Sequence, residues 1–358
     1  MFVVHRGKFC SNTPCLTPLV NFPAFGTFRK NPADRRCAIK NILVAAVTIL
    51  LSLAGPVRAA DKIRIGVPQQ VVHWMVFPLA QQKGFFKEEG FDAEIVGITG
   101  PSGRSALMSG DIDYYTTIAF IVQSAILGLP VKVVAAYVTC PPFVLMSRPE
   151  FKSAQDLKGK TMGIGAPPGS SPDVIAKLSL RHLGLNPDRD VKFVYLNSHE
   201  RTFLALEQGL YAVGLIPPPF DFQGKKLGFN SLARADEILT YPEDGLIATV
   251  KKIKEKPDEV KRVIRAGIKA NRYIRTQREG TIQFLMEWQK VNRETASANY
   301  DSAVRIFNDD GALPEAGLRL IIDEAKKTAK VEREIPLNEI ADLSILREAQ
   351  KELGIKPK

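Results

Sequence analysis

Residues 160–173 read KTMGIGAPPGSSPD, a strand pattern that leads into a helix start. Apolar side chains alternate through the first part, as they do in a strand, and residues 172–183 then have the spacing of an amphipathic helix. Gly169, Ser170 and Ser171 lie between the two elements. Ser171 can be explained as the N-cap of the helix, but the segment can also present backbone N–H groups to a ligand.

The elements around this stretch occur in the same order twice. In each copy a strand, a helix, a strand, a helix and a strand follow one another, and matching residues lie 99 positions apart. A repeat of this size predicts two similar parallel α/β lobes. The matched pairs include Gly66 with Gly165, Leu107 with Leu206, and Gly110 with Gly209. The expected elements are 62–68, 73–84, 92–96, 103–110 and 112–118 in the first copy, and 160–168, 172–183, 190–196, 200–209 and 211–216 in the second.

Two further segments connect the lobes. Residues 131–147 are nearly all apolar, as buried strands are, and can carry the chain from lobe 1 to lobe 2. Residues 245–250 have a strand pattern and can bring the chain back. We therefore expect lobe 1 to consist of residues 60–145 and 246–358, and lobe 2 to consist of residues 146–245.

From Pro257 to the end the pattern is helical, and Pro257 suits a first helical position. The first helix of this tail has an apolar stripe on one side and basic residues on the other. The basic residues are expected to form a solvated face or, alternatively, a docking surface. The stripe consists of Val260, Val263, Ile264, Gly267, Ile268 and Ile274, and the basic residues are Lys261, Arg265, Lys269 and Arg272.

The N-terminus has the features of a signal peptide. Basic residues precede the apolar run at 42–54, and Val57-Arg58-Ala59 suits cleavage before Ala60. The run is shorter than the roughly 20 residues that span a bilayer, so a retained anchor is the weaker alternative. Residues 1–34 are longer than such a leader needs, which favours a start codon further along the chain. We expect residues 1–59 to be removed and the mature protein to be periplasmic.

Charge and cysteine content exclude several classes of protein. Residues 1–59 hold eight of the 49 basic residues and one of the 38 acidic ones, so the mature chain carries a net charge of only about +4. A nucleic-acid partner is therefore not expected. Cys10, Cys15 and Cys37 lie in the leader, and Cys140 alone remains, which leaves no disulfide framework and no cysteine-based metal site. We expect no cofactor and no metal.

The order of several segments resembles that of a known family. The segments are LAQQKGFFKEEGFDAEIV (79–96), ALMSGDIDY (106–114), SAQDLKGKTMGIGAPPGSSP (153–172), ALEQGLYAVGLIPPPF (205–220) and LGFNSLA (227–233). Together they are similar to the extracytoplasmic solute-binding proteins of ABC importers in the nitrate/sulfonate/taurine class, which share their fold with thiamine-precursor binding proteins. The resemblance covers about residues 61–250.

This resemblance implies a two-lobed periplasmic binding protein fold of type II, in which each lobe has a parallel-rich sheet flanked by helices. It also implies a small-molecule ligand between the lobes, delivery to an ABC permease in the inner membrane, and a monomer. One feature departs from the family pattern: an acidic residue commonly follows the glycine of the second copy, as Asp113 follows Gly110 in the first, but here Gly209 is followed by Leu210, Tyr211 and Ala212. This departure leaves the substrate open.

Ligands of parallel α/β sheets bind beyond the carboxyl ends of the strands. Applied to both copies, this rule selects loops that face one another across a cleft. Free N–H groups at the helix start of 172–183 favour an anion such as a sulfonate or carboxylate, although Asp173 in the first turn already balances the helix dipole. The candidate ligand-binding residues are Gln69, His73, Trp74, Ser102, Thr116, Thr117, Gly169, Ser170, Ser171, Asn197, His199, Glu200 and Phe220.

Some of these residues have a second explanation. Trp74 can stack on a planar ligand or pack within the protein, and His73 begins the same helix. Glu200 is either an ordinary carboxylate at a helix start or a partner for an amine on the ligand. His182, near the end of a helix, is expected to pair with the helix dipole at the surface.

Two other functions share this fold class. An enzyme of thiamine-precursor synthesis needs a cysteine-rich motif and a reactive histidine, but the mature chain has one cysteine and the scattered histidines His73, His182 and His199. The effector domain of a LysR-type regulator needs a DNA-reading helix-turn-helix, and the N-terminus has a signal peptide instead. A ligand-sensing periplasmic protein remains as an alternative, and so does a thiamine-precursor (pyrimidine) binding protein or enzyme of the same fold. We therefore expect a binding protein and not an enzyme.

Overall fold

The computed structural model describes residues 60–356. The predicted leader and signal peptide, with their three cysteines, lie outside the described residues. Within residues 60–356, no helix is both long enough and apolar enough to cross a membrane.

Lobe 1 is built on a five-stranded sheet with the order β2-β1-β3-β10-β4. Strands β2, β1 and β3 are parallel, whereas β10 is antiparallel to both of its neighbours. The strands are β1 (Asp61–Val67), β2 (Phe91–Gly97), β3 (Tyr114–Thr117), β4 (Val131–Ala136) and β10 (Asp244–Thr249). The helices between them are η1 (Val72–Trp74), α2 (Val76–Gln82), α3 (Phe85–Glu88), α4 (Gly100–Ser109) and α5 (Ile118–Ile126).

Lobe 2 has a sheet of the same design with the order β7-β6-β8-β5-β9. Here β7, β6 and β8 are parallel and β5 is antiparallel to its neighbours. The strands are β5 (Val144–Ser147), β6 (Lys160–Ile164), β7 (Val191–Tyr195), β8 (Val213–Ile216) and β9 (Asn230–Arg234). The helices are η2 (Ala154–Leu157), α6 (Ser171–His182), α7 (His199–Glu207), α8 (Phe220–Lys226) and α9 (Ala235–Ile238).

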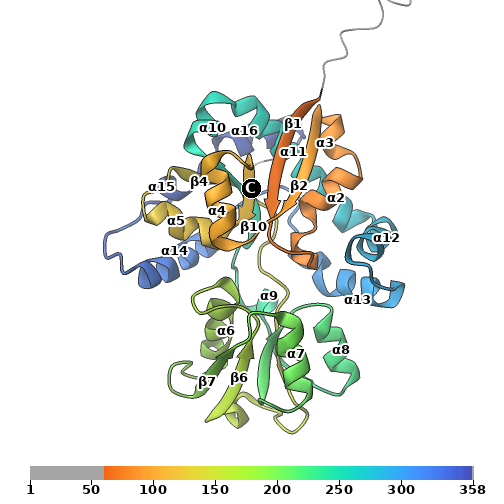
Figure 1. The fold of residues 1–358 in the computed structure, drawn as a ribbon, viewed down its shortest axis with the longest axis vertical. Coiled ribbons are helices and arrows are strands. Elements are labelled where there is room, and N and C mark those ends of the chain that lie inside the picture. Colours follow the sequence, from red (N-terminus) through yellow and green to blue (C-terminus); the bar gives the residue numbers. More distant parts are fainter. Residues whose placement is uncertain (1–59, 357–358) are drawn as a thin grey trace, which may run out of the picture. The chain divides into compact units, whose positions relative to one another are not determined.

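The predicted fold class, two lobes with parallel-rich sheets flanked by helices, is confirmed. In Figure 1 the elements of the second sheet, coloured green, lie below those of the first. The offset of 99 also holds: it separates the first residues of β1 and β6, of β3 and β8, of β4 and β9, and of α4 and α7. The predicted helix at 73–84 is instead divided into η1 and α2.

Each sheet receives one strand from the chain as it crosses between the lobes. Strand β5 follows the first crossing and joins the second sheet, and β10 follows the second crossing and joins the first. The predicted lobe boundaries, 145/146 and 245/246, fall inside these two strands and remain predictions.

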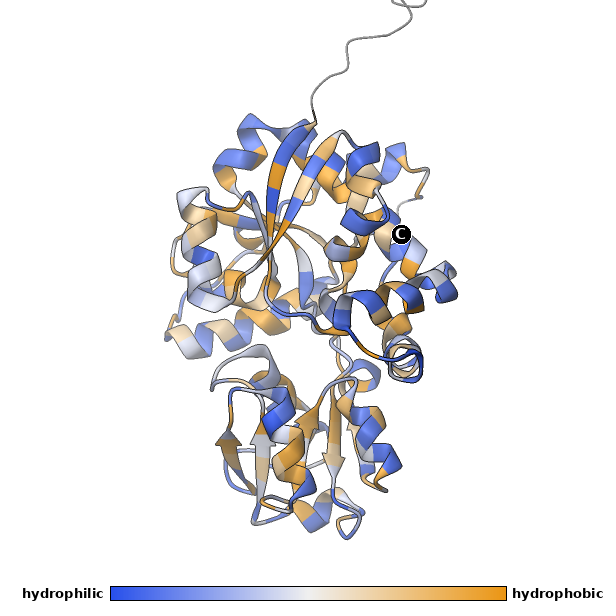
Figure 2. Cartoon of the chain, turned by 45° about the vertical axis from the view of Figure 1, so that its right-hand side comes forward, coloured by the Kyte–Doolittle hydropathy of each residue, from blue (hydrophilic) through white to orange (hydrophobic). Residues whose placement is uncertain are grey.

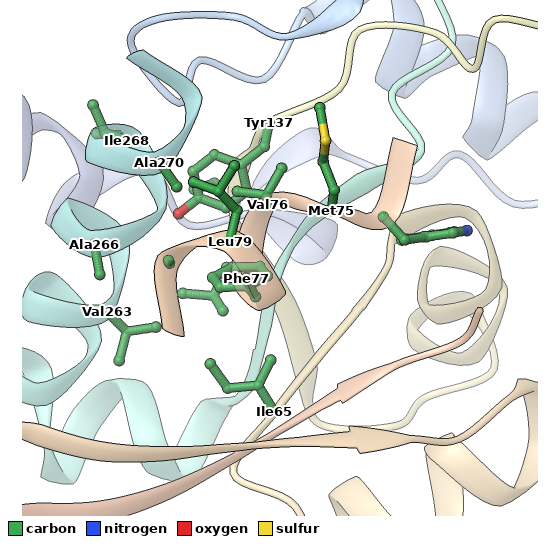
Figure 3. Packing of buried hydrophobic residues seen from close by; sticks show 14 of the residues in the cluster. Ile65, Met75, Val76, Phe77, Leu79, Tyr137, Val263, Ala266, Ile268 and Ala270 are labelled. Carbon is green, nitrogen blue, oxygen red and sulfur yellow. The ribbon is translucent and has the colours of Figure 1, made fainter. Parts of the chain in front are cut away.

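After β10 the chain is helical, as predicted, and these helices pack on lobe 1. The apolar stripe of α11 is buried against α2 and the first sheet. Figure 3 shows Phe77, Val263 and Ile65 in this core, and the rings of Phe77 and Tyr137 meet edge to face with centroids 5.3 Å apart. The elements are α10 (Val250–Glu255), α11 (Pro257–Thr276), α12 (Arg278–Gln289), α13 (Arg293–Ala303), η3 (Val304–Ile306), α14 (Glu315–Ala329), α15 (Leu337–Ile340) and α16 (Ser344–Glu352).

The basic side of α11 is not the freely solvated face expected from the sequence. The guanidinium of Arg265 pairs with Glu89 just after α3, and Lys269 Nζ lies 2.9 Å from Oε1 of the same glutamate. Lys261 Nζ lies 3.0 Å from Glu352 Oε1 on α16. These basic residues therefore attach α11 to elements of its own chain. Figure 2, coloured by hydropathy, shows that hydrophobic and hydrophilic residues both occur along the helices.

Polar contacts also connect lobe 2 to the C-terminal helices. Arg234 Nη2, at the end of β9, donates to the carbonyl oxygen of Ser302 on α13 at 3.0 Å. The Ser302 hydroxyl donates to Asp221 Oδ2 on α8 at 2.9 Å. Arg305 on η3 pairs with Asp236 and with Glu237 Oε1, the latter at 2.8 Å. This group of six residues links the second lobe to helices of the first.

Candidate functional site

A cavity of about 420 Å³ lies at the carboxyl ends of the parallel strands and is lined by both lobes. Lobe 1 contributes the loop after β1, the start of α4 and the end of β3, while lobe 2 contributes the loop after β6 and the start of α7. This is the location that the strand-end rule predicts. Nine of the thirteen candidate residues line the cavity: Gln69, His73, Trp74, Thr117, Gly169, Ser170, Ser171, Asn197 and His199.

The other four candidates do not line the cavity. Thr116 is buried, and its hydroxyl donates to the carbonyl oxygen of Gly66 at 3.1 Å. Because side chains alternate along a strand, Thr117 faces the cavity and Thr116 faces the opposite side of the sheet. Phe220 stacks on Phe203 in the core of lobe 2, with centroids 5.5 Å apart. Ser102 and Glu200 are exposed outside the lining.

The helix start at residues 169–173 differs from the sequence prediction. Ser170, and not Ser171, is the N-cap residue of α6, and its side chain makes no capping hydrogen bond. The N–H of Gly169 donates to Asp173 Oδ2 at 2.8 Å, and the N–H of Ser170 donates to the carbonyl oxygen of Pro167 at 3.2 Å. The two N–H groups that the sequence analysis assigned to an anion are therefore already bonded within the chain.

Asp173 is the centre of this helix start. Its carboxylate is 1% exposed and also accepts from Lys177 Nζ at 2.9 Å and from the Tyr195 hydroxyl at 2.8 Å. A lysine, a phenol and a backbone N–H thus balance its charge. Gly169 has φ +78°, a conformation that favours glycine. The backbone conformation therefore explains the glycine at this position, which also lines the cavity.

A row of four rings forms one wall of the cavity. The His73 ring lies 5.3 Å from Trp74 and 5.8 Å from Phe143, measured between centroids. Phe143 in turn lies 5.5 Å from His199. The row begins in lobe 1, passes through the crossing segment at Phe143 and ends at the start of α7 in lobe 2. Such a wall offers a continuous apolar surface to a ligand.

Both histidines of the row are held neutral by burial. Burial lowers the pKa of His73 to about 3, with a smaller contribution from His199, and lowers the pKa of His199 to about 4. The Nδ1 atom of each ring is buried and has no hydrogen-bond partner in the described part of the chain. Gly165 makes room for one of these rings, because a Cβ at Gly165 would lie 2.4 Å from His199 Nδ1.

Glu243 is the most unusual side chain of the lining. It is 6% exposed, and its Oε2 atom has no partner among residues 60–356. Burial raises the pKa of Glu243 to about 7, and a hydrogen bond from the Ser171 side chain partly offsets this rise. Ser171 also lies within hydrogen-bonding reach of the Tyr241 side chain. Its hydroxyl therefore faces the polar end of the cavity instead of capping α6.

Glu243 and Phe143 were not predicted from the sequence, and the reason is the same topological one for both. Each residue immediately precedes an antiparallel strand, β10 or β5. The start of an antiparallel strand lies at the same edge of the sheet as the carboxyl ends of its parallel neighbours. A strand-end rule restricted to parallel strands overlooks this position. The signal was the acidic pair Glu243-Asp244 directly before an apolar strand.

Helix α14 is the other part of the lining that the sequence did not reveal. It contributes Ile321, Glu324, Ala325 and Thr328. The helix faces the 165–173 loop, since a Cβ at Gly169 would meet Thr328 Cγ2 at 3.6 Å. Among the described residues, the charged side chains of the lining are two glutamates, Glu243 and Glu324, with no lysine or arginine.

A second cavity, of about 760 Å³, is lined by residues of lobe 1, including three residues of α12: Phe284, Glu287 and Trp288. None of the buried unpartnered polar atoms of the described residues belongs to its lining. Residues 60–356 also contain no group of three histidine, cysteine or acidic residues that could hold a metal ion. The 420 Å³ cavity is therefore the candidate site.

Two lobes of this design, with a cavity lined by both, define the periplasmic binding protein fold. The chain belongs to the NMT1/THI5-like family, whose model matches residues 72–279. A Brucella abortus protein that carries the name of a binding protein is 27% identical over 268 residues, which cover 71% of this chain and 81% of that protein.

Solved structures have the same fold. The periplasmic aliphatic sulphonate binding protein SsuA of Escherichia coli has a TM-score of 0.65 at 19% identity and covers 78% of this chain and 97% of its own. The periplasmic nitrate-binding protein NrtA of Synechocystis has a TM-score of 0.69 at 14% identity, with coverage of 82% and 89%. The desulfurization enzyme DszB is also similar, with a TM-score of 0.57 at 13% identity and coverage of 82% and 99%.

Proposed function

We propose that this protein is the extracytoplasmic solute-binding component of an ABC importer. It captures a small organic solute between its lobes and delivers it, as a monomer, to a permease in the inner membrane. The observation that carries the proposal is the cavity itself: both lobes line it, and it contains buried polar atoms that the described chain leaves unpartnered. Ligand sites of this volume and position are the norm for such folds. The similarity to binding proteins of import systems supports the same conclusion.

The test is ligand-dependent closure of the two lobes. Mass spectrometry of protein isolated from the periplasm identifies the copurified solute, and small-angle X-ray scattering then compares the ligand-free and saturated protein. We expect a smaller radius of gyration with the solute. An unchanged profile at saturation contradicts the proposal.

We propose further that the protein acts in the periplasm after cleavage near Ala60. The support is the apolar run at 42–54 followed by Val57-Arg58-Ala59. N-terminal sequencing of the periplasmic protein should begin at or near Ala60. Recovery of the full-length chain in the membrane fraction contradicts this.

We propose binding without chemical conversion, although DszB is an enzyme of similar fold. Cys140, the single cysteine of residues 60–356, is buried outside the lining, so none of these residues supplies a thiol nucleophile to the cavity. The copurified solute should be released with unchanged mass after prolonged incubation with the protein. A new product formed in proportion to protein concentration would instead support an enzyme.

A further inference from the structure

We propose that the ligand has a nitrogen that is cationic or donates N–H, that this nitrogen binds the Glu243 carboxylate, and that the ligand's apolar body lies against the ring row. This inference rests on the proposed function, because it assumes that the 420 Å³ cavity holds the transported solute. It differs from the anion predicted by the sequence.

The charge of the cavity is the first argument. In the part of the chain that the structure describes, its lining contains two glutamates and no lysine or arginine. His73 and His199 add no positive charge near neutral pH, because burial holds the pKa of both rings far below 7. An anionic ligand would lose its hydration and find no cation in return, which is strongly unfavourable.

The backbone offers no substitute for the missing cations at residues 169 and 170. Their N–H groups donate to Asp173 and Pro167, as described above. At this helix start the negative partner of the N–H groups is already a side chain of the protein. A ligand anion would have to displace the Asp173 carboxylate, which Lys177 and Tyr195 also hold.

The surroundings of Glu243 are the second argument. Besides burial, the charge of Glu243 raises the pKa values of Tyr115, Cys140, Tyr241 and Asp244, and none of these four side chains can carry a positive charge. Among residues 60–356, the hydrogen-bond partner that acts on the Glu243 carboxyl group is the Ser171 side chain. Buried carboxylate oxygens normally have a donor. A ligand N–H directed at Oε2 supplies it.

The ring row accounts for the other part of the ligand. Trp74 and Phe143 present aromatic surface. His73 lies between them and His199 lies beside Phe143, and the Nδ1 atom of each histidine has no partner among the described residues. A neutral imidazole has one nitrogen that accepts and one that donates, so His73 and His199 can each make one hydrogen bond with the ligand. The wall therefore suits an apolar or aromatic body with few polar atoms.

The test uses three probes of one size and three charges: benzamidinium, benzamide and benzoate. Calorimetric titration and thermal melts of the mature protein measure their binding. We expect benzamidinium to bind most tightly and benzoate to bind most weakly. Glu243→Gln should weaken benzamidinium binding about tenfold to a hundredfold, as expected for a lost hydrogen bond to a charged group.

The matched control is Glu200→Gln, the same substitution at an exposed carboxylate outside the lining. We expect it to bind benzamidinium like the parent protein. The parent should also bind benzamidinium about tenfold more tightly at about pH 8 than at about pH 6, because the cation requires an ionised Glu243. This pH dependence should be absent from Glu243→Gln.

Three results overturn the inference: tighter binding of benzoate, no detectable binding of benzamidinium, or unchanged benzamidinium binding by Glu243→Gln. Failure of the proposed function gives a different result. If benzoate or another anion binds and compacts the lobes in scattering, the solute-binding function stands and only the ligand class is wrong. If the copurified solute produces no compaction, the function itself is wrong.

Discussion

Burial of the Glu243 carboxyl group makes its ionisation unfavourable in the folded protein. Its pKa is about 7 when folded, against an ordinary value of 4.5. Because the folded-state pKa is raised, the stability that Glu243 contributes is fully present below about pH 4.5 and is lost as the pH rises to about 7. Burial, with a smaller contribution from the charge of Glu243, also raises the pKa of neighbouring Asp244.

We therefore predict that Glu243→Gln becomes more stable relative to the parent as the pH rises. The difference in the free energy of unfolding should grow between about pH 4.5 and about pH 7, by an amount on the order of 3 kcal/mol. Denaturant unfolding of both proteins at several pH values measures it. A difference that does not change with pH would show that Glu243 ionises normally.

His73 and His199 have the opposite pH dependence. Since burial lowers their pKa values to about 3 and about 4, their contribution to stability is present above about pH 6.5 and is lost as the pH falls. Both proteins in the previous comparison share this contribution, so it cancels in their difference.

Gly165 allows the close approach of β6 to the start of α7. We predict that Gly165→Ala destabilises the protein by about 1–3 kcal/mol and weakens solute binding, because the new Cβ would lie 2.4 Å from Nδ1 and 2.8 Å from Cα of His199. The control is Gly97→Ala, where nothing lies within 4 Å of the new Cβ. Thermal melts and calorimetry measure both effects, and equal behaviour of the two variants would contradict the prediction.

At the scale of elements, the sequence predicted the repeat of strands and helices correctly. It predicted the helix after residue 170 but assigned its N-cap to the wrong serine. The spacing of glycine and apolar residues along the chain directly indicates where strands and helices begin and end. The offset of 99 seen in the sequence therefore also separates the strands of the structure. The cap depends on side chains far apart in the chain: Tyr195, on β7, reaches Asp173 on α6. No local pattern reveals such a contact, and the sequence therefore assigned the N-cap to Ser171.

Helix α6 should depend on Asp173. We predict that Asp173→Asn lowers the free energy of unfolding by about 3 kcal/mol, because the buried carboxylate loses its ion pair with Lys177 and an acceptor for the Gly169 N–H or the Tyr195 hydroxyl. Chemical denaturation measures the loss. Asp188→Asn, at an exposed position in the turn after α6, should have almost no effect. Similar losses in the two variants would contradict a special role for Asp173.

For the whole molecule, the sequence predicted the parts of the cavity lining that come from loops after parallel strands. It did not predict the parts that come from segments far away in the chain. The loops follow parallel strands, and their common edge is a consequence of topology that the repeat discloses. Helix α14 reaches the cavity from the C-terminal region, and the pattern of its own residues contains no information about which loop it will face. The same holds for Glu243 and Phe143, which depend on the direction of β10 and β5.

The polar contacts between lobe 2 and the C-terminal helices should hold these parts together; the six residues are Arg234, Asp221, Ser302, Arg305, Asp236 and Glu237. We predict that Arg305→Ala lowers stability by about 1 kcal/mol, a small amount because Arg305 is half-exposed, and that it increases amide hydrogen exchange in β9 and α9. Exchange in β1 and β2 is the internal control. Uniform changes in all strands would indicate global destabilisation.

The return of β10 to the first sheet also sets the order in which the lobes can be completed during synthesis. Every strand of the second sheet lies between residues 144 and 234, so that sheet can close as soon as this stretch is available. Strand β4 pairs with β10 alone in the first sheet, and β10 ends at Thr249. Lobe 1 is therefore synthesised first but completed last. Its strand β4 stays unpaired until lobe 2 and then β10 have been synthesised.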